Sequence, residues 1–285
     1  MKKNLYITLV FVCCIGLFSF SDKKRNTPAF SCKEVVLRMI NAIADVKGLK
    51  YNLKITERTK GKFNYFSSSV KLNRNPRKLY LTTNGIEVLW TVGTNKGDAL
   101  VKPNSFPYMN LNLDPMGNLM RDGQHHTINE MGFDYFGNIV AYNVLKTGNN
   151  FDDYFKLEGE EILNGKPCYK FSINNPDFKF IDYTVLKGEN LVTIARKLHV
   201  GEFMILENNK KLDNYKDVKA GQIIKVPTAY AKYVVIYLDK QLFLPVGSRI
   251  NDDKGLYEQY DYFNLQLNPT FAEDEFTKNF KGYGF

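Results

Sequence analysis

Apolar and polar residues alternate with a period of two over most of this chain, and this pattern predicts β-strands. The run Leu49-Tyr51-Leu53-Ile55 is the first clear example. Similar runs, bounded by turn residues, follow at 63–72, 78–83, 86–92, 154–162, 167–173, 233–238, 242–250 and 256–267. The pairs Asn84-Gly85 and Asn164-Gly165 separate neighbouring runs, and such pairs favour tight hairpin turns. The sequence therefore predicts a large antiparallel sheet.

Two segments change to the helical period. Ser31 and Glu34 have the spacing of a capping box, which marks the start of a helix. The apolar stripe that follows consists of Val36, Met39, Ile40 and Ile43. Thr127 and Glu130 repeat the capping-box spacing and predict a second helix that runs to about Lys146. Helices together with an antiparallel sheet indicate the α+β class.

The stretch 183–227 has a pattern of its own. It begins with the short β-type run Tyr183-Thr184-Val185 and ends with another, Ile223 to Val226. Between them, Leu191, Ile194, Ala195 and Leu198 give one helix an apolar face, with Asn190 placed to cap it. A shorter helix contains Phe203, Ile205 and Leu206. The pattern predicts a βααβ unit between two runs of host strands.

This stretch resembles the LysM family of glycan-binding modules over its whole length. The opening Tyr183-Thr184-Val185, then Gly188, Leu191 and Ile194-Ala195, and the closing Gly221-Gln222 and Val226-Pro227 match the family pattern. Two positions depart from it: Glu189 replaces the usual aspartate and Asn190 the usual threonine. Both replacements keep a polar loop, so they affect the expected affinity more than the expected fold.

The resemblance implies a groove for N-acetylglucosamine chains, as in peptidoglycan or chitin. On this chain the matching loops contain Gly188, Glu189, Asn190 and Leu191 on one side, and Asn209, Lys210 and Lys211 on the other. Gly188 would let the backbone approach a sugar closely. The alternative is that these residues only cap helices and form turns, because a fold does not by itself guarantee a functional site.

The rest of the chain resembles the LolA-like superfamily, in which helices pack on a curved antiparallel β half-barrel. The segments that carry the resemblance are Val234 to Lys240, Leu244 to Val246, Tyr262 to Asn268 and Gln124 to Ile128. It implies one discontinuous domain, residues 32–182 and 228–280, interrupted by the LysM-like module at 183–227. The superfamily also implies an apolar concavity that holds acyl chains in some members; an ordinary filled core is the alternative.

The N-terminus has the pattern of a secretory signal peptide over residues 1–21. Lys2-Lys3 precedes an apolar run from Leu5 to Phe20, which is short for a membrane span of ~20 residues. Cys13 and Cys14 lack the small preceding residue expected at a lipidation site. A signal peptide predicts a periplasmic or cell-envelope location, where Cys32 and Cys168 would either form one disulfide or remain two free thiols.

Charge and motifs narrow the function further. The formal charge of +9 lacks the basic block or stripe typical of nucleic-acid binding, so we expect no nucleic-acid partner. The positive charge instead suits attraction to the anionic cell envelope, or it simply keeps the protein soluble. No motif of a metalloprotease, serine hydrolase or nucleotide-binding loop is present, and we predict neither a cofactor, a metal site nor a catalytic residue. His125 and His126 are interpreted as structural, and Cys32 as a weak candidate for a thiol of lowered pKa.

The sequence thus predicts a secreted, non-enzymatic envelope protein that binds peptidoglycan through the module. Its half-barrel would hold an apolar ligand, an acyl chain, or a partner such as a lipoprotein. Two alternative functions remain at this point. The first is a lipid or lipoprotein carrier that the module tethers to the wall, and the second is an uncharacterised wall hydrolase.

Overall fold

The computed structural model describes residues 30–285. The predicted signal peptide and the cysteines at positions 13 and 14 lie outside this range. Among the described residues, no helix combines the length and the apolar character needed to cross a membrane.

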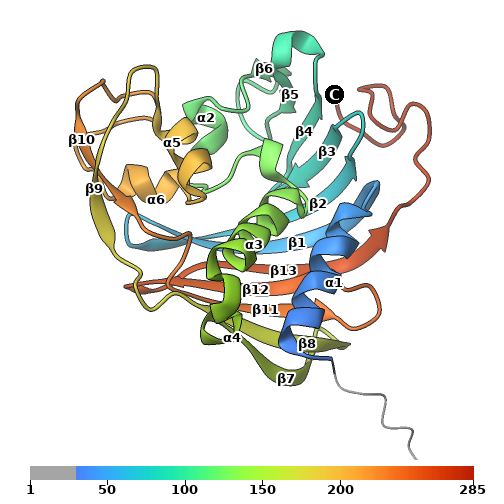
Figure 1. The fold of residues 1–285 in the computed structure, drawn as a ribbon. Coiled ribbons are helices and arrows are strands. Elements are labelled where there is room, and N and C mark those ends of the chain that lie inside the picture. Colours follow the sequence, from blue (N-terminus) through green and yellow to red (C-terminus); the bar gives the residue numbers. More distant parts are fainter. Residues whose placement is uncertain (1–29) are drawn as a thin grey trace, which may run out of the picture.

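One antiparallel sheet of eleven strands dominates the described part of the chain (Figure 1). Its spatial order is β6-β5-β4-β3-β2-β1-β13-β12-β11-β8-β7, so that the last strand pairs with the first. The strands are β1 (Gly48–Thr59), β2 (Lys62–Asn73), β3 (Lys78–Thr83), β4 (Ile86–Thr91), β5 (Ala99–Lys102), β6 (Leu111–Leu113), β7 (Phe155–Leu163), β8 (Lys166–Asn174), β11 (Tyr233–Asp239), β12 (Pro245–Asp252) and β13 (Gly255–Leu267). The sheet curves, and helices cover its inner face. The predicted α+β half-barrel is confirmed.

Helices α1 (Cys32–Ala44) and α3 (Asp134–Thr147) lie against the inner face of the sheet. The capping box predicted for α1 is present, because Ser31 accepts a hydrogen bond from the Glu34 N–H and the Glu34 carboxylate accepts one in return. The remaining short helical segments are η1 (Asn95–Gly97), α2 (Asn118–Arg121), η2 (Ile128–Glu130), η3 (Gly148–Asn150) and α4 (Phe151–Tyr154).

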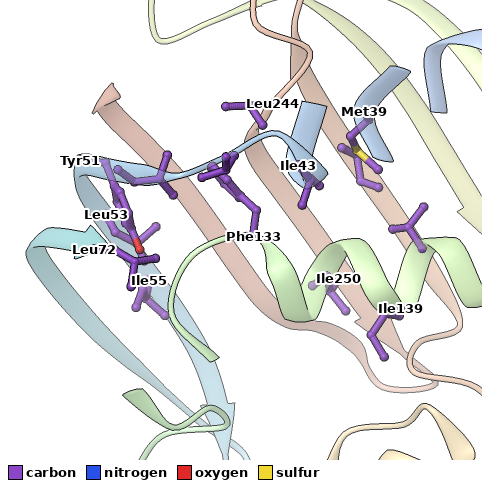
Figure 2. Packing of buried hydrophobic residues seen from close by; sticks show 14 of the residues in the cluster. Met39, Ile43, Tyr51, Leu53, Ile55, Leu72, Phe133, Ile139, Leu244 and Ile250 are labelled. Carbon is purple, nitrogen blue, oxygen red and sulfur yellow. The ribbon is translucent and has the colours of Figure 1, made fainter. Parts of the chain in front are cut away.

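The main core fills the space between these helices and the sheet (Figure 2). Met39 and Ile43 of α1 and Ile139 of α3 belong to the same buried cluster as Leu53 of β1 and Ile250 of β12. This is the burial that the alternating strand pattern and the helical stripe together require. Trp90, the only tryptophan of the chain, is buried there as well.

The helix predicted from Thr127 to Lys146 is not continuous. Its capping box starts only the single turn η2, and the regular helix α3 begins at Asp134. Gly132 separates the two with φ +92°, a left-handed conformation that ends helical geometry. A side chain there would also collide with the buried Leu72, since a Cβ would lie 2.6 Å from its Cδ2. Tertiary packing therefore overrides the local helix signal.

The inserted unit, residues 183–227, lies between β8 and β11 in the sequence, and these two strands pair directly with each other. Its own two-stranded sheet consists of β9 (Phe180–Thr184) and β10 (Ile223–Pro227), with α5 (Leu191–Leu198) and α6 (Glu202–Glu207) between them. Phe180 and Ile181, which fall within the expected host range 32–182, pair with Pro227 and Val226 and so belong to this small sheet. The host hairpin is closed instead by Asn174 opposite Tyr233.

The C-terminal segment, residues 268–285, covers the outer face of β1 to β3, which the sequence pattern did not predict. Glu275 is almost fully buried there and forms ion pairs with Lys50 at 2.7 Å and Lys71 at 3.0 Å. The ring of Tyr283 stacks on that of Tyr80, with centroids 3.5 Å apart. These contacts shield an outer face that would otherwise expose the apolar parts of its side chains.

Gly132→Ala tests the packing that separates η2 from α3. We expect it to lower the free energy of unfolding by about 1–3 kcal/mol, because the new methyl group meets Leu72 in a backbone conformation that alanine disfavours. Urea denaturation measures the change. Gly61→Ala is the matched control: its φ is also positive, at +77°, but nothing lies within 4 Å of its Cβ. Equal losses in the two variants would contradict the packing explanation.

Candidate functional site

The inserted unit has a separate hydrophobic core between its helices and its strand pair. The buried members of this core are Val185, Leu191, Ile194, Ala195, Val200, Ile205, Leu212, Tyr215, Ile224 and Val226. Leu191, one of the residues expected to line a glycan groove, is completely buried in it. Its side chain therefore belongs to the core of the unit and is not exposed to a ligand.

The loop before α5 contains three of the expected site residues. Gly188 adopts φ +85°, and the Glu189 carboxylate accepts hydrogen bonds from the Tyr183 hydroxyl and the Leu186 N–H, both at 2.9 Å. The backbone hydrogen bond from Leu186 lowers the pKa of Glu189, and Lys197 at 3.0 Å adds to this effect. Glu189 thus ties the loop to Tyr183 and Lys197.

Asn190 begins α5. Its Oδ1 accepts a hydrogen bond of 3.0 Å from the Thr193 N–H, and its own N–H donates to Thr193 Oγ1. The N–H of Leu191 donates to the carbonyl of Tyr215 at 2.9 Å. This bond joins the start of α5 to the segment around Tyr215, so both segments lie on the same side of one cleft.

The other expected side of the groove is arranged differently. The Asn209 amide donates to the carbonyls of Ile205 and Lys225 and accepts from the Lys225 N–H, at 2.7 to 2.9 Å. Asn209 therefore connects the end of α6 to β10, a structural role. Lys210 and Lys211 are exposed. The structure brings Asn190 together with residues 214–216, while 209–211 lie outside the cleft lining.

This cleft has a volume of about 590 Å³ and two walls. The inserted unit contributes Asn190, Val192, Thr193, Asn214, Tyr215 and Lys216. The half-barrel contributes Asp114, Met116, Gly117, Asn118 and Arg121, from the connection between β6 and α2 and from α2 itself. Figure 1 shows α2 beside α5. Residues 214–216 could not be predicted as site residues, because the segment between α6 and β10 has no periodic pattern. The host wall could not be predicted either, because no local signal links residues 114–121 to the unit.

A buried seam fixes the two walls relative to each other. Arg121 Nη2 lies 2.9 Å from Glu202 Oε1, and each side chain is only 2% exposed. The Arg121 guanidinium also lies over the ring of Tyr215, 3.3 Å from its centroid. Arg196 of α5 forms ion pairs with both Glu202, at 3.5 Å, and Glu130 of the half-barrel. A desolvated pair of this kind fixes geometry more than it adds stability.

The two adjacent histidines belong to a buried polar network behind this seam. His125 Nδ1 lies 2.8 Å from Glu258 Oε1, and its Nε2 lies 2.9 Å from the carbonyl of Arg58. His126 Nδ1 lies 2.8 Å from Glu130, and its Nε2 lies 3.0 Å from the Tyr230 hydroxyl. Within residues 30–285 no group of three or more metal-ligating side chains is suitably placed for an ion.

The charges of this network stabilise one another. Burial opposes the charge on His126, but Glu258 and Glu130 raise its pKa well above the usual value. Burial likewise opposes ionisation of Glu130, yet the hydrogen bond and charge of His126, with the charge of Arg196, lower its pKa to about 2. The protonated form of His126 and the ionised form of Glu130 are therefore both favoured.

An apolar cavity extends from this network into the half-barrel, between α3 and the sheet. Its apolar lining includes Leu53, Ile139, Val140, Val234 and Ile250. Its volume is about 100 Å³, whereas pockets for small molecules typically measure ~300–1,000 Å³. The interior of the half-barrel is thus mostly filled, and the cleft beside the inserted unit is the larger site.

Cys32 and Cys168 are both free thiols. Burial raises the pKa of Cys32 to about 11, and Asp152 and Glu158 reinforce the effect. The hypothesis of a lowered pKa at the start of α1 is therefore wrong, because desolvation outweighs the helix terminus.

Two protein families match the chain. Residues 46–180 match "Protein of unknown function (DUF1571)", and residues 183–227 match "LysM domain". Residues 183–227 form a LysM domain. Its boundaries coincide with the stretch in which the sequence pattern predicted the module. No curated protein matches the chain.

Several solved structures are similar to the chain at low sequence identity. MucB from Pseudomonas aeruginosa, in complex with MucA, has a TM-score of 0.39 and 12% identity over 86% of this chain and 60% of that chain. The Mycobacterium tuberculosis lipoprotein LppX gives 0.42 and 11% over 85% and 98%. A LolA superfamily protein from Nitrosomonas europaea gives 0.33 and 11% over 88% and 99%. The chain spans about 60% of the length of MucB. These similarities concern the fold alone.

Because the pKa of His126 is raised in the folded state, the protein should lose stability as the pH becomes alkaline. A histidine whose pKa is higher in the folded state adds stability below its unfolded pKa of about 6.5 and loses it as pH rises through the folded pKa. We expect the free energy of unfolding to fall above pH 6.5, by at most about 1.4 kcal/mol per pH unit for one proton. Urea denaturation at several pH values measures this slope.

His126→Gln should flatten that alkaline slope. His199→Asn is the control, since His199 stacks on Tyr142 away from the network and sits in a left-handed conformation that asparagine tolerates. A slope that persists unchanged in His126→Gln would assign the pH dependence to other groups.

The seam gives a second prediction. Arg121→Met should destabilise the protein by about 3 kcal/mol, because it leaves the buried Glu202 without its nearest partner. Glu202→Leu should also destabilise, while the double variant Arg121→Met/Glu202→Leu should recover most of the loss, since both charges then leave the interior together. Thermal unfolding of all four proteins measures the coupling, and additive losses would show that the two residues do not interact.

Proposed function

We propose that this protein is a secreted cell-envelope protein that binds N-acetylglucosamine-containing glycan, peptidoglycan above all, through the cleft at the LysM domain. The observation that carries the proposal is the cleft itself. Its volume of about 590 Å³ falls within the ~300–1,000 Å³ typical of ligand pockets, and it opens where Asn190 meets Tyr215.

The chemistry of the cleft suits an acetamido sugar. Amides at Asn190 and Asn214 can both donate and accept hydrogen bonds, as the sugar's hydroxyl and acetamido groups require. Val192 supplies an apolar surface for the acetyl methyl group. Among the residues expected from sequence, Asn190 would contact the sugar directly, whereas Gly188, Glu189 and Leu191 would shape the loop and Asn209 would hold β10 in place.

We propose binding and not catalysis. A general acid must hold a proton near neutral pH, which requires a raised carboxyl pKa. Glu258 and Glu130, two of the carboxylates that line the half-barrel cavity, show the opposite: despite burial, the charge of His126 with hydrogen bonds from both histidines lowers the pKa of Glu258, and His126 with Arg196 lowers that of Glu130. The ionised form of both is favoured, which does not suit a general acid.

The half-barrel would serve chiefly as the support of the LysM domain. A long acyl chain does not fit a cavity of about 100 Å³, so lipid carriage would require α3 to move away from the sheet. The signal-peptide pattern of residues 1–21 and the +9 charge favour the envelope, where the wall is anionic.

Lys216→Trp tests the glycan site from the LysM side. Lys216 is exposed at the cleft, so a tryptophan there fills space without disturbing the core. We expect sedimentation with purified peptidoglycan to fall at least ~10-fold in apparent affinity. The readout is the fraction of protein that pellets as peptidoglycan is titrated.

Lys219→Trp is the matched control, because Lys219 is an exposed lysine of the same domain outside the cleft lining. It loses the same charge and adds the same ring, so it should sediment like the unmodified chain. If the unmodified chain fails to pellet, or if both variants pellet equally well, the proposed function is wrong.

A further inference from the structure

We propose that the glycan site is composite: the half-barrel segment Asp114–Arg121 forms its second wall and takes part in recognising the sugar chain. This inference rests on the proposed glycan binding and extends it to the DUF1571-matching part of the chain. It assigns a ligand-contacting role to Asp114 and Asn118, which lie outside the LysM domain.

Both the half-barrel and the LysM domain line the cleft. Five of its eleven residues belong to the half-barrel, and six belong to the LysM domain. Asp114 and Asn118 are exposed, so their side chains are free to meet a ligand that enters between the walls. A sugar chain seated beside Asn190 and Thr193 would therefore lie against the half-barrel as well.

Hydrogen bonds and an ion pair hold the half-barrel wall in place. The Gly117 N–H donates to the Asp114 carbonyl at 2.9 Å, and the Met116 N–H donates to Asp114 Oδ1 at 2.8 Å. Arg121, at the end of α2, is fixed by Glu202 and by the ring of Tyr215. A wall held in this way is preorganised, so little conformational entropy is lost when a ligand binds.

The guanidinium group of Arg121 is only partly satisfied by hydrogen bonds. Its Nε and Nη1 are buried and have no hydrogen-bond partner, and the side chain lines the cleft. Buried donors without a hydrogen-bond partner destabilise the folded state. The structure therefore accepts a cost to keep a guanidinium at this point, which we attribute to positioning the wall against Tyr215.

The two walls offer complementary chemistry to an N-acetylhexosamine chain. Asp114 Oδ1 is engaged by the Met116 N–H, which leaves Oδ2 to accept hydrogen bonds from sugar hydroxyls. The amide of Asn118 can donate to an acetamido carbonyl and accept from a hydroxyl. Met116 adds apolar surface opposite Val192. The ligand class is an N-acetylated hexosamine oligomer, which chitin and peptidoglycan share.

Asn118→Trp blocks the cleft from the half-barrel side. We expect at least a ~10-fold loss of affinity for peptidoglycan by sedimentation, and for soluble ligands by isothermal titration calorimetry of the full chain. Two soluble ligands separate the sources of the shared chemistry: an N-acetylglucosamine hexamer and a muropeptide. If affinity for both ligands falls, the half-barrel wall recognises the sugar backbone that they share. If affinity for only one of them falls, the wall recognises that ligand specifically.

Leu119→Trp is the control, because Leu119 is the next residue of α2, is 71% exposed and does not line the cleft. It should bind within about twofold of the unmodified chain. Asp114→Ala adds a milder test that removes the carboxylate without adding bulk, and we expect a ~3-fold or larger loss.

The outcomes distinguish this inference from the proposed function. If Lys216→Trp abolishes binding while Asn118→Trp and Asp114→Ala bind like the unmodified chain, the LysM domain alone makes the site and the composite wall is wrong. If the unmodified chain binds no glycan, the proposed function itself fails. Circular dichroism confirms that each variant is folded, so that lost binding reports on the cleft.

Discussion

The antiparallel pairing of β9 with β10 is the constraint on which the rest of the structure depends. It places the two ends of the LysM domain side by side, and the Thr228 N–H donates to the Lys179 carbonyl at 2.9 Å just outside the pair. Because neighbouring strands lie only ~4.8 Å apart, β8 and β11 can pair past the insertion without distortion. A domain with distant ends would have forced these two strands apart.

That same constraint decides where the LysM domain lies. A domain held by two adjacent chain segments is oriented by them, and here it rests on α2 and on the start of α3. Arg121, Glu202, Arg196 and Glu130 then form a desolvated charge cluster between the two parts. Charges buried in this way demand correct partners, so they favour one arrangement over all others. The cleft between the walls follows from this fixed arrangement.

The interior of the half-barrel is largely filled. Side chains of the strands and of α3 pack between helix and sheet, and a cavity of about 100 Å³ remains. His126 lies 2.8 Å from Glu130 and 3.5 Å from Glu258 there, so the histidine offsets part of the charge of the two carboxylates. The cleft at the junction with the insertion is a separate opening, lined by both parts of the chain.

Sequence by itself determined the local elements and the nature of the insertion. Alternation predicted nearly every long strand, the Ser31–Glu34 capping box predicted α1, and a set of spaced residues identified the LysM domain. These signals succeed because they arise between residues close together in the sequence. Helix caps, tight turns and the regular spacing of apolar side chains on one face of an element are all of this kind. Asn190 was recognised for the same reason, as a helix cap beside the expected groove.

Only the tertiary structure decided the rest. It broke the helix expected after Thr127 at Gly132, because Leu72 occupies the space that a side chain would need. It engaged Asn209 with backbone groups of β10 and brought residues 114–121 to the cleft from about seventy positions away in the chain. Such contacts join segments whose own sequences carry no trace of each other, so no local pattern could have revealed them.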